Sequence, residues 1–487
     1  MSPFEITLAI SILVLGGYAV TGLVNFGRSR SYESFFLFDR NLSPENVRNT
    51  FTGAAISIST VLIFFLTLSP VFGWYIFLSP LTLALGVFLF GNVVYPRLQR
   101  RRGLMSALKG EASPSIDSLG DLIQFLYGAP WLSRTITAIS GFGIVCVLVA
   151  ELMVGVTIYQ QYFLRPEYIV FLIAGTLFVY AGFGGLRSVV QTDRWQVRLI
   201  VISVALIVLA LAIQESADGD ARSRSMWTHS WRPVAAMPLA LILNMLFVNL
   251  CFLPSSLRVW QVVAGSAKGT KFRRALWLST AQVTFILTCA VFVGRGVAVR
   301  NPGSPVDLQG IFAFLANNES PLVSYAVYPL FVAALLSALV STADSAILPL
   351  AQVMSAKQAK WRSKVVLRNV FGLLAAVIAF YFLVTKALEF ELVPWILTVL
   401  SVTTCIAPAI VVPILVPKKR FSRRATLVVG GGVIAGCATA LAWSVAYREI
   451  AVTPWNCIIG VGISLLCCLV ACAMPEDAVD NKPRSEA

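Results

Sequence analysis

Two adjacent hydroxyl residues, Ser341 and Thr342, lie inside a long apolar segment and could bind a small cation. Compact oxygen ligands suit a hard cation such as sodium better than nitrogen or sulfur ligands do. The alternative is that each hydroxyl bonds to the backbone carbonyl group four residues earlier, which requires no ion. The two residues alone leave both interpretations open.

A second group of small and polar residues, TGAAISIST, occupies residues 52–60 and includes Gly53, Ser57 and Thr60. A helix can unwind inside a membrane only where protein or water satisfies the freed carbonyl groups. The group therefore indicates either an unwound helix at a binding site or two helices that pack closely through small residues.

Asn244, Asn249 and Pro254 form a third group, in a later apolar segment that runs in the opposite direction. Interrupted helices at matching positions of two halves of a chain indicate a binding site near the middle of the bilayer. The alternative is that the polar side chains only bond across to a neighbouring helix.

Two acidic residues stand inside or beside apolar segments, where an unpaired charge is costly. Glu151 is isolated within residues 131–158, so it either contacts a proton, cation or solute or serves as a neutral or paired structural acid. Asp193 precedes Arg194 and Arg198 at the expected start of a helix. It could attract a cation, or it could cap that helix.

The elements that must position these residues are membrane helices. The chain has 487 residues, of which 57% are apolar and 13% are charged, whereas soluble domains contain about 45–50% and about 25%. This composition excludes a soluble enzyme, a disordered protein and a coiled coil, and it predicts an all-α integral membrane protein. About thirteen apolar segments of transmembrane length are expected, at residues 5–27, 50–69, 73–96, 131–158, 167–185, 188–213, 234–256, 274–297, 322–348, 365–385, 392–416, 425–446 and 455–474.

Positive charge predicts the orientation of these helices. With the N-terminus outside and the C-terminus inside, the inner loops carry most of the 38 Lys and Arg residues, with clusters at 97–102, 268–274, 357–368 and 418–424. The net charge of +15 is then explained by loops at a lipid bilayer, and no nucleic-acid partner is expected. The sequence thus predicts a multi-pass protein of the plasma (cytoplasmic) membrane.

We expect a single polytopic membrane domain over residues 1–487. The core is expected at about 50–416, with peripheral helices at 5–27, 425–446 and 455–474 and a short cytoplasmic tail at 475–487. His229 is the only histidine, and neither a metal-binding cluster nor a nucleophile–base pair is recognisable. Enzymatic activity is therefore not expected.

Residues 184–196, GGLRSVVQTDRWQ, resemble the signature of the sodium/solute symporter family, GG-x-x-A-V-x-x-T-D-x-x-Q. Ser188 stands at the position of the alanine. The segment AALLSALVSTADS at 333–345 resembles the cation-binding helix of that family. Gly73-Trp74 and residues 118–134 resemble its G-W and T-L-P-E-Y-L segments.

The resemblance implies an inverted-repeat core of helices 2–6 and 7–11, with helices 1, 12 and 13 peripheral. It also implies a sodium site formed by the carbonyl groups of Gly53, Ile56 and Ala338 and the hydroxyl groups of Ser341 and Thr342. Asp193 matches an acidic residue near the path of the ion. The solute is expected near the polar residues of the interrupted helices and near an acid that matches the family loosely, namely Ser57, Thr60, Glu151, Asn244 and Asn249.

The chain departs from the family pattern in two places. Residues 63–66, Ile-Phe-Phe-Leu, contain no glycine where the family has a Gly-rich break in helix two. Residues 255–261, SSLRVWQ, replace the N-Q-x-x-V-Q-R that ends helix seven. Both segments are expected near the solute cavity or its inner gate, so they concern the identity of the solute.

The function predicted on this basis is sodium-coupled symport of a small organic solute by alternating access, with sodium as the coupling ion and no other cofactor. A neutral or zwitterionic solute is favoured because no dense Arg or Lys cluster faces the expected midplane. The alternatives are a proton-coupled or uncoupled carrier in which Glu151 titrates, and a membrane sensor that binds a solute without moving it. The expected partners are the solute, Na⁺ and the lipid bilayer.

Overall fold

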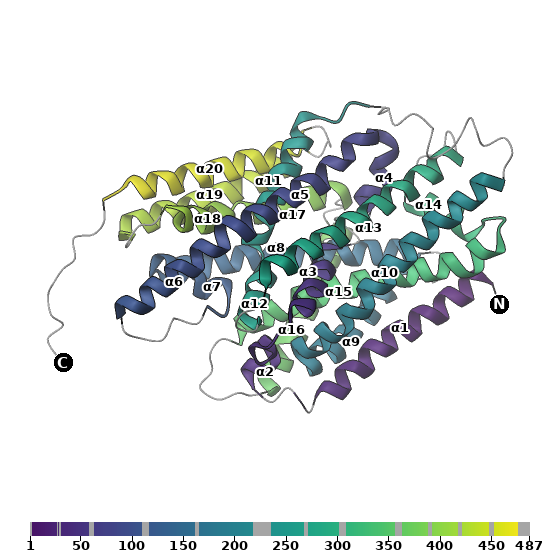
Figure 1. Ribbon diagram of the computed structural model, residues 1–487, viewed down its shortest axis with the longest axis horizontal. Helices are drawn as coiled ribbons and strands as arrows, with labels where there is room; N and C mark the ends of the chain where they lie inside the picture. Colours follow the sequence, from purple (N-terminus) through teal and green to yellow (C-terminus); the bar gives the residue numbers. More distant parts are fainter. Residues whose placement is uncertain are drawn as a thin grey trace.

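The computed structural model describes residues 2–26, 28, 31–57, 63–109, 116–160, 165–217, 235–266, 271–300, 308–355, 363–387, 392–416, 421–447 and 452–475. Almost all of these residues are helical, as the composition predicts, and they form a bundle of long helices (Figure 1). In this part of the chain ten helices are long and apolar enough to cross a membrane, or up to eleven with a bent pair counted as one span. The expected total of about thirteen stays a prediction.

The bent pair is α11 (Leu239–Ser255) and α12 (Leu257–Gly265), which meet at 42°. Some of the ten spans combine consecutive helices. The span Phe65–Arg102 runs through α4 (Ile63–Phe72), α5 (Leu78–Leu89) and α6 (Tyr95–Lys109), Tyr168–Gln214 through α9 (Tyr168–Leu177) and α10 (Gly184–Ala217), and Trp395–Leu415 through α17 (Leu392–Thr404) and α18 (Ala407–Leu415). The other spans are formed mainly by α1 (Pro3–Phe26), α8 (Pro130–Tyr159), α13 (Phe272–Arg300), α15 (Tyr328–Met354), α16 (Ser363–Phe382), α19 (Arg423–Ala446) and α20 (Trp455–Ala473). The short helices outside these spans are α2 (Tyr32–Leu37), α3 (Pro44–Ala55), α7 (Leu119–Tyr127) and α14 (Leu308–Ala316).

The helix expected at 50–69 is broken. α3 begins earlier, at Pro44, because the Ser43 side chain caps it by accepting a hydrogen bond from the Asn46 amide. Ile56 leaves the helical conformation, with φ −98° and ψ 73°, and the next helix begins at Ile63. Residues 63–66, which lack the glycine of the family pattern, therefore belong to α4. The helix is interrupted before this segment, at Ile56.

The stretch Tyr168–Gln214 is helical over 47 residues. At 1.5 Å per residue this is about 70 Å, more than twice the hydrocarbon core of about 30 Å. Gly185 divides the stretch with a left-handed φ of +59°, and a side chain there would lie 2.7 Å from the Phe35 carbonyl oxygen. The stretch thus corresponds to the two segments expected at 167–185 and 188–213.

α15 is the most deeply buried helix of the site. Every residue from Phe331 to Gln352 is buried, and the helix packs against α1, α3, α8, α10 and α16. Its hydroxyl groups face protein rather than lipid, so neighbouring helices must satisfy them. Figure 1 shows α1 along one edge of the bundle and α19 and α20 along the opposite edge, where peripheral helices are expected.

Close contact between α13 and α4 depends on Gly294, since a Cβ atom there would lie 2.1 Å from the Leu66 carbonyl oxygen. We expect Gly294→Ala to push the two helices apart, to cost about 1–3 kcal/mol, and to lower the melting temperature of the purified protein in detergent. Gly372→Ala in α16 is the control, because a Cβ atom there meets nothing within 4 Å and alanine favours a helix. An equal decrease in melting temperature in the two variants would contradict the close contact at Gly294.

Candidate functional site

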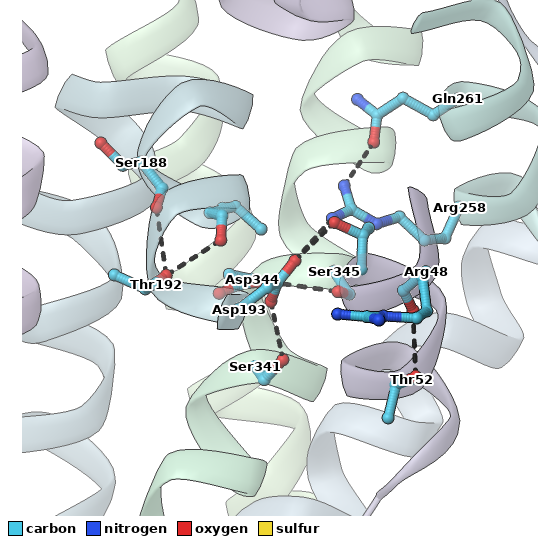
Figure 2. Close-up of polar contacts among 12 residues, drawn as sticks. Arg48, Thr52, Ser188, Thr192, Asp193, Arg258, Gln261, Ser341, Asp344 and Ser345 are labelled. Atoms are coloured by element: carbon cyan, nitrogen blue, oxygen red, sulfur yellow. Dashed lines mark hydrogen bonds and ion pairs between the residues drawn. The ribbon is translucent and has the colours of Figure 1, made fainter. Parts of the chain in front are cut away.

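Asp193 joins three helices at the centre of the bundle. Its Oδ2 atom accepts a hydrogen bond of 2.7 Å from the Thr50 hydroxyl of α3, and its Oδ1 atom accepts one of 3.1 Å from the Ser341 hydroxyl of α15. Figure 2 shows the contact with Ser341. Asp193 is fully buried and lies well inside α10, which begins at Gly184. The alternative that it caps the start of a helix is therefore wrong.

α3 and α15 approach each other closely at Gly53. A Cβ atom on this residue would lie 2.6 Å from Ser341 Oγ and 3.2 Å from Asp193 Oδ1. α3 ends two residues later, and the last carbonyl groups of a helix lack intrahelical donors and carry partial negative charge. The predicted ligand carbonyls of Gly53 and Ile56 belong to this end of α3. The partial negative charge at this end of the helix would attract a cation.

The hydroxyl groups of α15 divide between the two expected interpretations. Thr342 donates a 3.0 Å hydrogen bond to the Ala338 carbonyl, as back-bonding predicts, whereas Ser341 donates to Asp193 instead. Both hydroxyl hydrogens are thus engaged within the protein, while the oxygen atoms keep lone pairs that can accept a cation. These acceptors, together with the carbonyls of α3, fit a hard cation.

A cavity of about 150 Å³ adjoins this set of oxygens. Thr342 belongs to its lining, and so do Ser57, Asn244 and Asn249, three of the residues expected near the solute. Glu151 is fully buried and accepts a hydrogen bond from the Ser57 hydroxyl. Thr60, the remaining residue of that expected set, lies outside the described residues.

Both asparagine side chains that line the cavity already donate to the protein. The Asn249 amide donates to Thr82 Oγ1 at 2.8 Å and to the Ser79 carbonyl at 3.1 Å. The Asn244 amide donates to the Pro454 carbonyl at 3.2 Å. Among the described residues the lining contains no charged side chain, and most of it consists of apolar groups such as Phe65, Met245, Val248, Phe252, Leu287, Ile396 and Leu400.

Two charged residues near Asp193 were missed in the sequence. Asp344 is fully buried in α15 and accepts a 2.7 Å hydrogen bond from the Tyr180 hydroxyl. Arg258 lies at the start of α12, with its Nη2 atom 3.9 Å from Asp193 Oδ2 (Figure 2). The altered segment at 255–261 was a signal for Arg258, because it places an arginine where the family pattern specifies none.

Polar contacts also surround Gln352, near the C-terminal end of α15. Gln352 donates to the Tyr32 hydroxyl at 3.1 Å and to the Asp117 carbonyl at 3.0 Å, and Arg40 forms a 2.9 Å ion pair with the Asp117 side chain. Burial raises the pKa of Tyr32 to about 12, so its hydroxyl stays protonated at physiological pH. This network holds the segment before α3 against the end of the buried helix.

The comparisons with known proteins bear on the fold. The chain matches no protein-family model and no curated protein sequence. Its structure is similar to the substrate-bound, outward-open state of a Na⁺-coupled sialic acid symporter, with a TM-score of 0.71 over 96% of this chain and 98% of that chain at 14% identity. The chain shares this transporter's fold. The predicted all-α membrane transporter fold is thereby confirmed.

Two other solved structures are less similar. Mhp1, a nucleobase-cation-symport-1 family transporter in a closed conformation with bromovinylhydantoin bound, has a TM-score of 0.49 at 13% identity, over 91% of this chain and 94% of that chain. MhsT in complex with L-phenylalanine has a TM-score of 0.46 at 13% identity, over 88% of this chain and 98% of that chain. The individual site residues stay predictions.

The oxygen ligands of α15 can be tested one at a time. We expect Ser341→Ala and Thr342→Ala each to raise the sodium concentration that gives half-maximal thermal stabilisation by about 10- to 150-fold, since each deletes a contact worth about 1.5–3 kcal/mol. Ser345→Ala is the control, because this hydroxyl bonds to Asp344 at 3.3 Å and not to the predicted ligands. If all three variants respond to sodium like the parent, the ion does not bind here.

Proposed function

We propose that the protein is a sodium-coupled symporter that moves a small organic solute across the membrane by alternating access. One observation carries the proposal: Thr342 belongs both to the predicted sodium ligands and to the lining of the cavity. Because Thr342 belongs to both sites, binding of sodium orders the solute site and binding of the solute orders the sodium site. The fold shared with a Na⁺-coupled sialic acid symporter supports the same conclusion.

In this mechanism sodium binds first to oxygen atoms on two packed helices. The carbonyl groups of Gly53 and Ile56 come from the end of α3, and the carbonyl of Ala338 and the hydroxyls of Ser341 and Thr342 come from α15. The bound ion holds the chain in place where α3 ends at Ile56. The next residue, Ser57, lines the solute cavity. By linkage, sodium tightens solute binding by the same factor as solute tightens sodium, about 5–150-fold for coupled sites.

Asp193 gives the site its negative charge. Its carboxylate is fully buried and bonds to a predicted sodium ligand, so it attracts a cation through surroundings of low dielectric constant. We place the N-terminus outside and the C-terminus inside, in the plasma membrane, so that the ion leaves toward the cytoplasm. The direction is supported by the charge of the loops.

The cavity favours an uncharged, compact solute. It has no charged side chain in its described lining, and the amides of Asn244 and Asn249 already donate to protein acceptors. Its volume of about 150 Å³ is similar to that of a cavity that holds one benzene ring. An anionic sugar acid, or a zwitterion with two charged groups, would leave charges without partners among these residues.

A matched set of probes tests the proposed function. We expect nicotinamide, an uncharged ring with an amide, to raise the melting temperature of the purified protein in sodium chloride but not in choline chloride. Nicotinate, which has the same ring with a carboxylate, and glucose should have little effect. A probe that stabilises the protein should also undergo sodium-dependent counterflow in proteoliposomes, which a sensor would not support. Stabilisation by nicotinate or glucose alone would contradict the proposed solute class.

A proton-coupled carrier is the second candidate, and one observation favours it. Glu151 is fully buried in α8 and accepts a hydrogen bond from Ser57, a residue of the cavity lining. A carboxyl group in this position can exchange a proton in step with the solute. Counterflow that continues in choline chloride, follows pH and is lost in Glu151→Gln would select this candidate.

The proposed orientation has a direct test in intact cells. Asn317 and Arg424 are both exposed, and the charge distribution places them on opposite sides of the membrane. In a chain without its native cysteines, we expect Asn317→Cys to react with an impermeant maleimide from outside and Arg424→Cys to react only after permeabilisation. The opposite pattern would reverse the direction assigned to transport.

A further inference from the structure

Arg258 is a buried positive charge at the joint between α11 and α12. Ser256 breaks the helix there, with φ −84° and ψ 121°, and Arg258 follows in the first turn of α12. The residue is only 4% exposed. Its neighbour Trp260 donates to the Pro254 carbonyl at 2.8 Å across the break, which fixes the start of α12 beside α15 and α3.

The guanidinium is directed toward Asp193 without bonding to it. Its Nη2 atom lies 3.9 Å from Asp193 Oδ2, which is longer than the 2.7–2.9 Å typical of a charge-assisted hydrogen bond. Nη1 donates to Gln261 Oε1 at 2.9 Å, while Nε and Nη2 have no hydrogen-bond partner among the described residues. Within the described part of the chain, Arg258 thus keeps two buried donors without acceptors, and one of them, Nη2, faces a carboxylate that hydroxyls from two other helices already contact.

The carboxylate of Asp193 lies between Arg258 and the predicted sodium ligands. Ser341 approaches one oxygen of the carboxylate, whereas Arg258 approaches the other. Asp344 of α15 also lies near this cluster, but its carboxyl group accepts hydrogen bonds from Tyr180 at 2.7 Å and from Ser345 at 3.3 Å. One carboxylate, that of Asp193, thus stands between two positive groups, the guanidinium of Arg258 and the cation predicted at α3 and α15.

We infer that Arg258 is a tethered competitor of the sodium ion for Asp193. The inference rests on the proposed function and adds a residue that controls release of the ion. While sodium occupies the ligands of α3 and α15, it shares the charge of Asp193 and the guanidinium stays at a distance. When sodium leaves, the two free N–H groups close on the carboxylate and replace the lost positive charge.

Arg258 also borders a second cavity next to the solute cavity. A second, smaller cavity of about 30 Å³ is lined by Thr50, Ser256 and Arg258, and it shares Ala54 and Phe252 with the solute cavity. α12 continues from this point to Gly265, whose carbonyl accepts a 3.0 Å hydrogen bond from the Leu42 amide at the expected cytoplasmic end. The competitor therefore stands on the side from which the ion is expected to leave.

Removal of the competing charge should strengthen sodium binding. We expect Arg258→Gln to lower the sodium concentration for half-maximal thermal stabilisation by about tenfold or more, because a unit charge about 4 Å from the carboxylate no longer opposes the ion. Gln261→Ala should act in the opposite direction, because the guanidinium loses its acceptor and is free to pair with Asp193. Arg187→Gln is the control, since this half-buried arginine of α10 forms its 3.1 Å ion pair with Asp39 and not with Asp193.

Sodium affinity that is unchanged or weaker in Arg258→Gln would overturn the inference, and would make Arg258 a residue that holds Asp193 in place. If Arg258→Gln does not fold, a severalfold weaker affinity in Gln261→Ala supports the inference and an unchanged affinity overturns it. A sodium response that appears only in Arg258→Gln would support Arg258 as the competitor while contradicting sodium coupling in the natural chain. No response in either protein would overturn both proposals.

Discussion

A carboxylate at the centre of a membrane bundle must be surrounded by donors or cations, and Asp193 imposes this requirement on the whole site. A hydroxyl from α3, a hydroxyl from α15 and a guanidinium from α12 converge on it. The two hydroxyls come from residues 143 and 148 positions away in the sequence. The glycine contact between α3 and α15 and the complete burial of α15 allow these groups to meet.

The cost of burying polar groups in a membrane also explains which site residues could be predicted from the sequence. Lipid penalises unsatisfied polar groups, so Ser341, Thr342 and Asp193 stood out within apolar segments, and the structure brings them together. The small and polar residues at 52–60 left both an unwound helix and close packing open, and the structure shows that the helix ends at Ile56 within this run. Arg258 was missed because an arginine at the end of an apolar segment is usually a loop charge, and only the folded chain shows that it is buried.

The predicted ion site and the cavity are built from the same helices. α15 contributes Thr342 to both, and the end of α3 contributes carbonyl groups to one and Ser57 to the other. Asn244 and Asn249 from α11 line the opposite part of the cavity, just before the joint that carries Arg258. Two interrupted helices therefore flank the cavity, and the ionic contacts lie at their broken ends, which is the arrangement that the proposed transport mechanism requires.

The deep burial of α15 has a consequence for biogenesis. An aspartate at the centre of an emerging helix adds about 2.5–3.5 kcal/mol to the cost of membrane insertion, and Asp344 sits in such a helix. Domains assemble from the N-terminus while synthesis continues. Tyr180 and Asp193, the partners of Asp344 and Ser341, precede α15 in the chain. The helix that carries Asp344 and Ser341 is therefore translated after the groups that satisfy these two residues, which limits the time that they spend facing lipid.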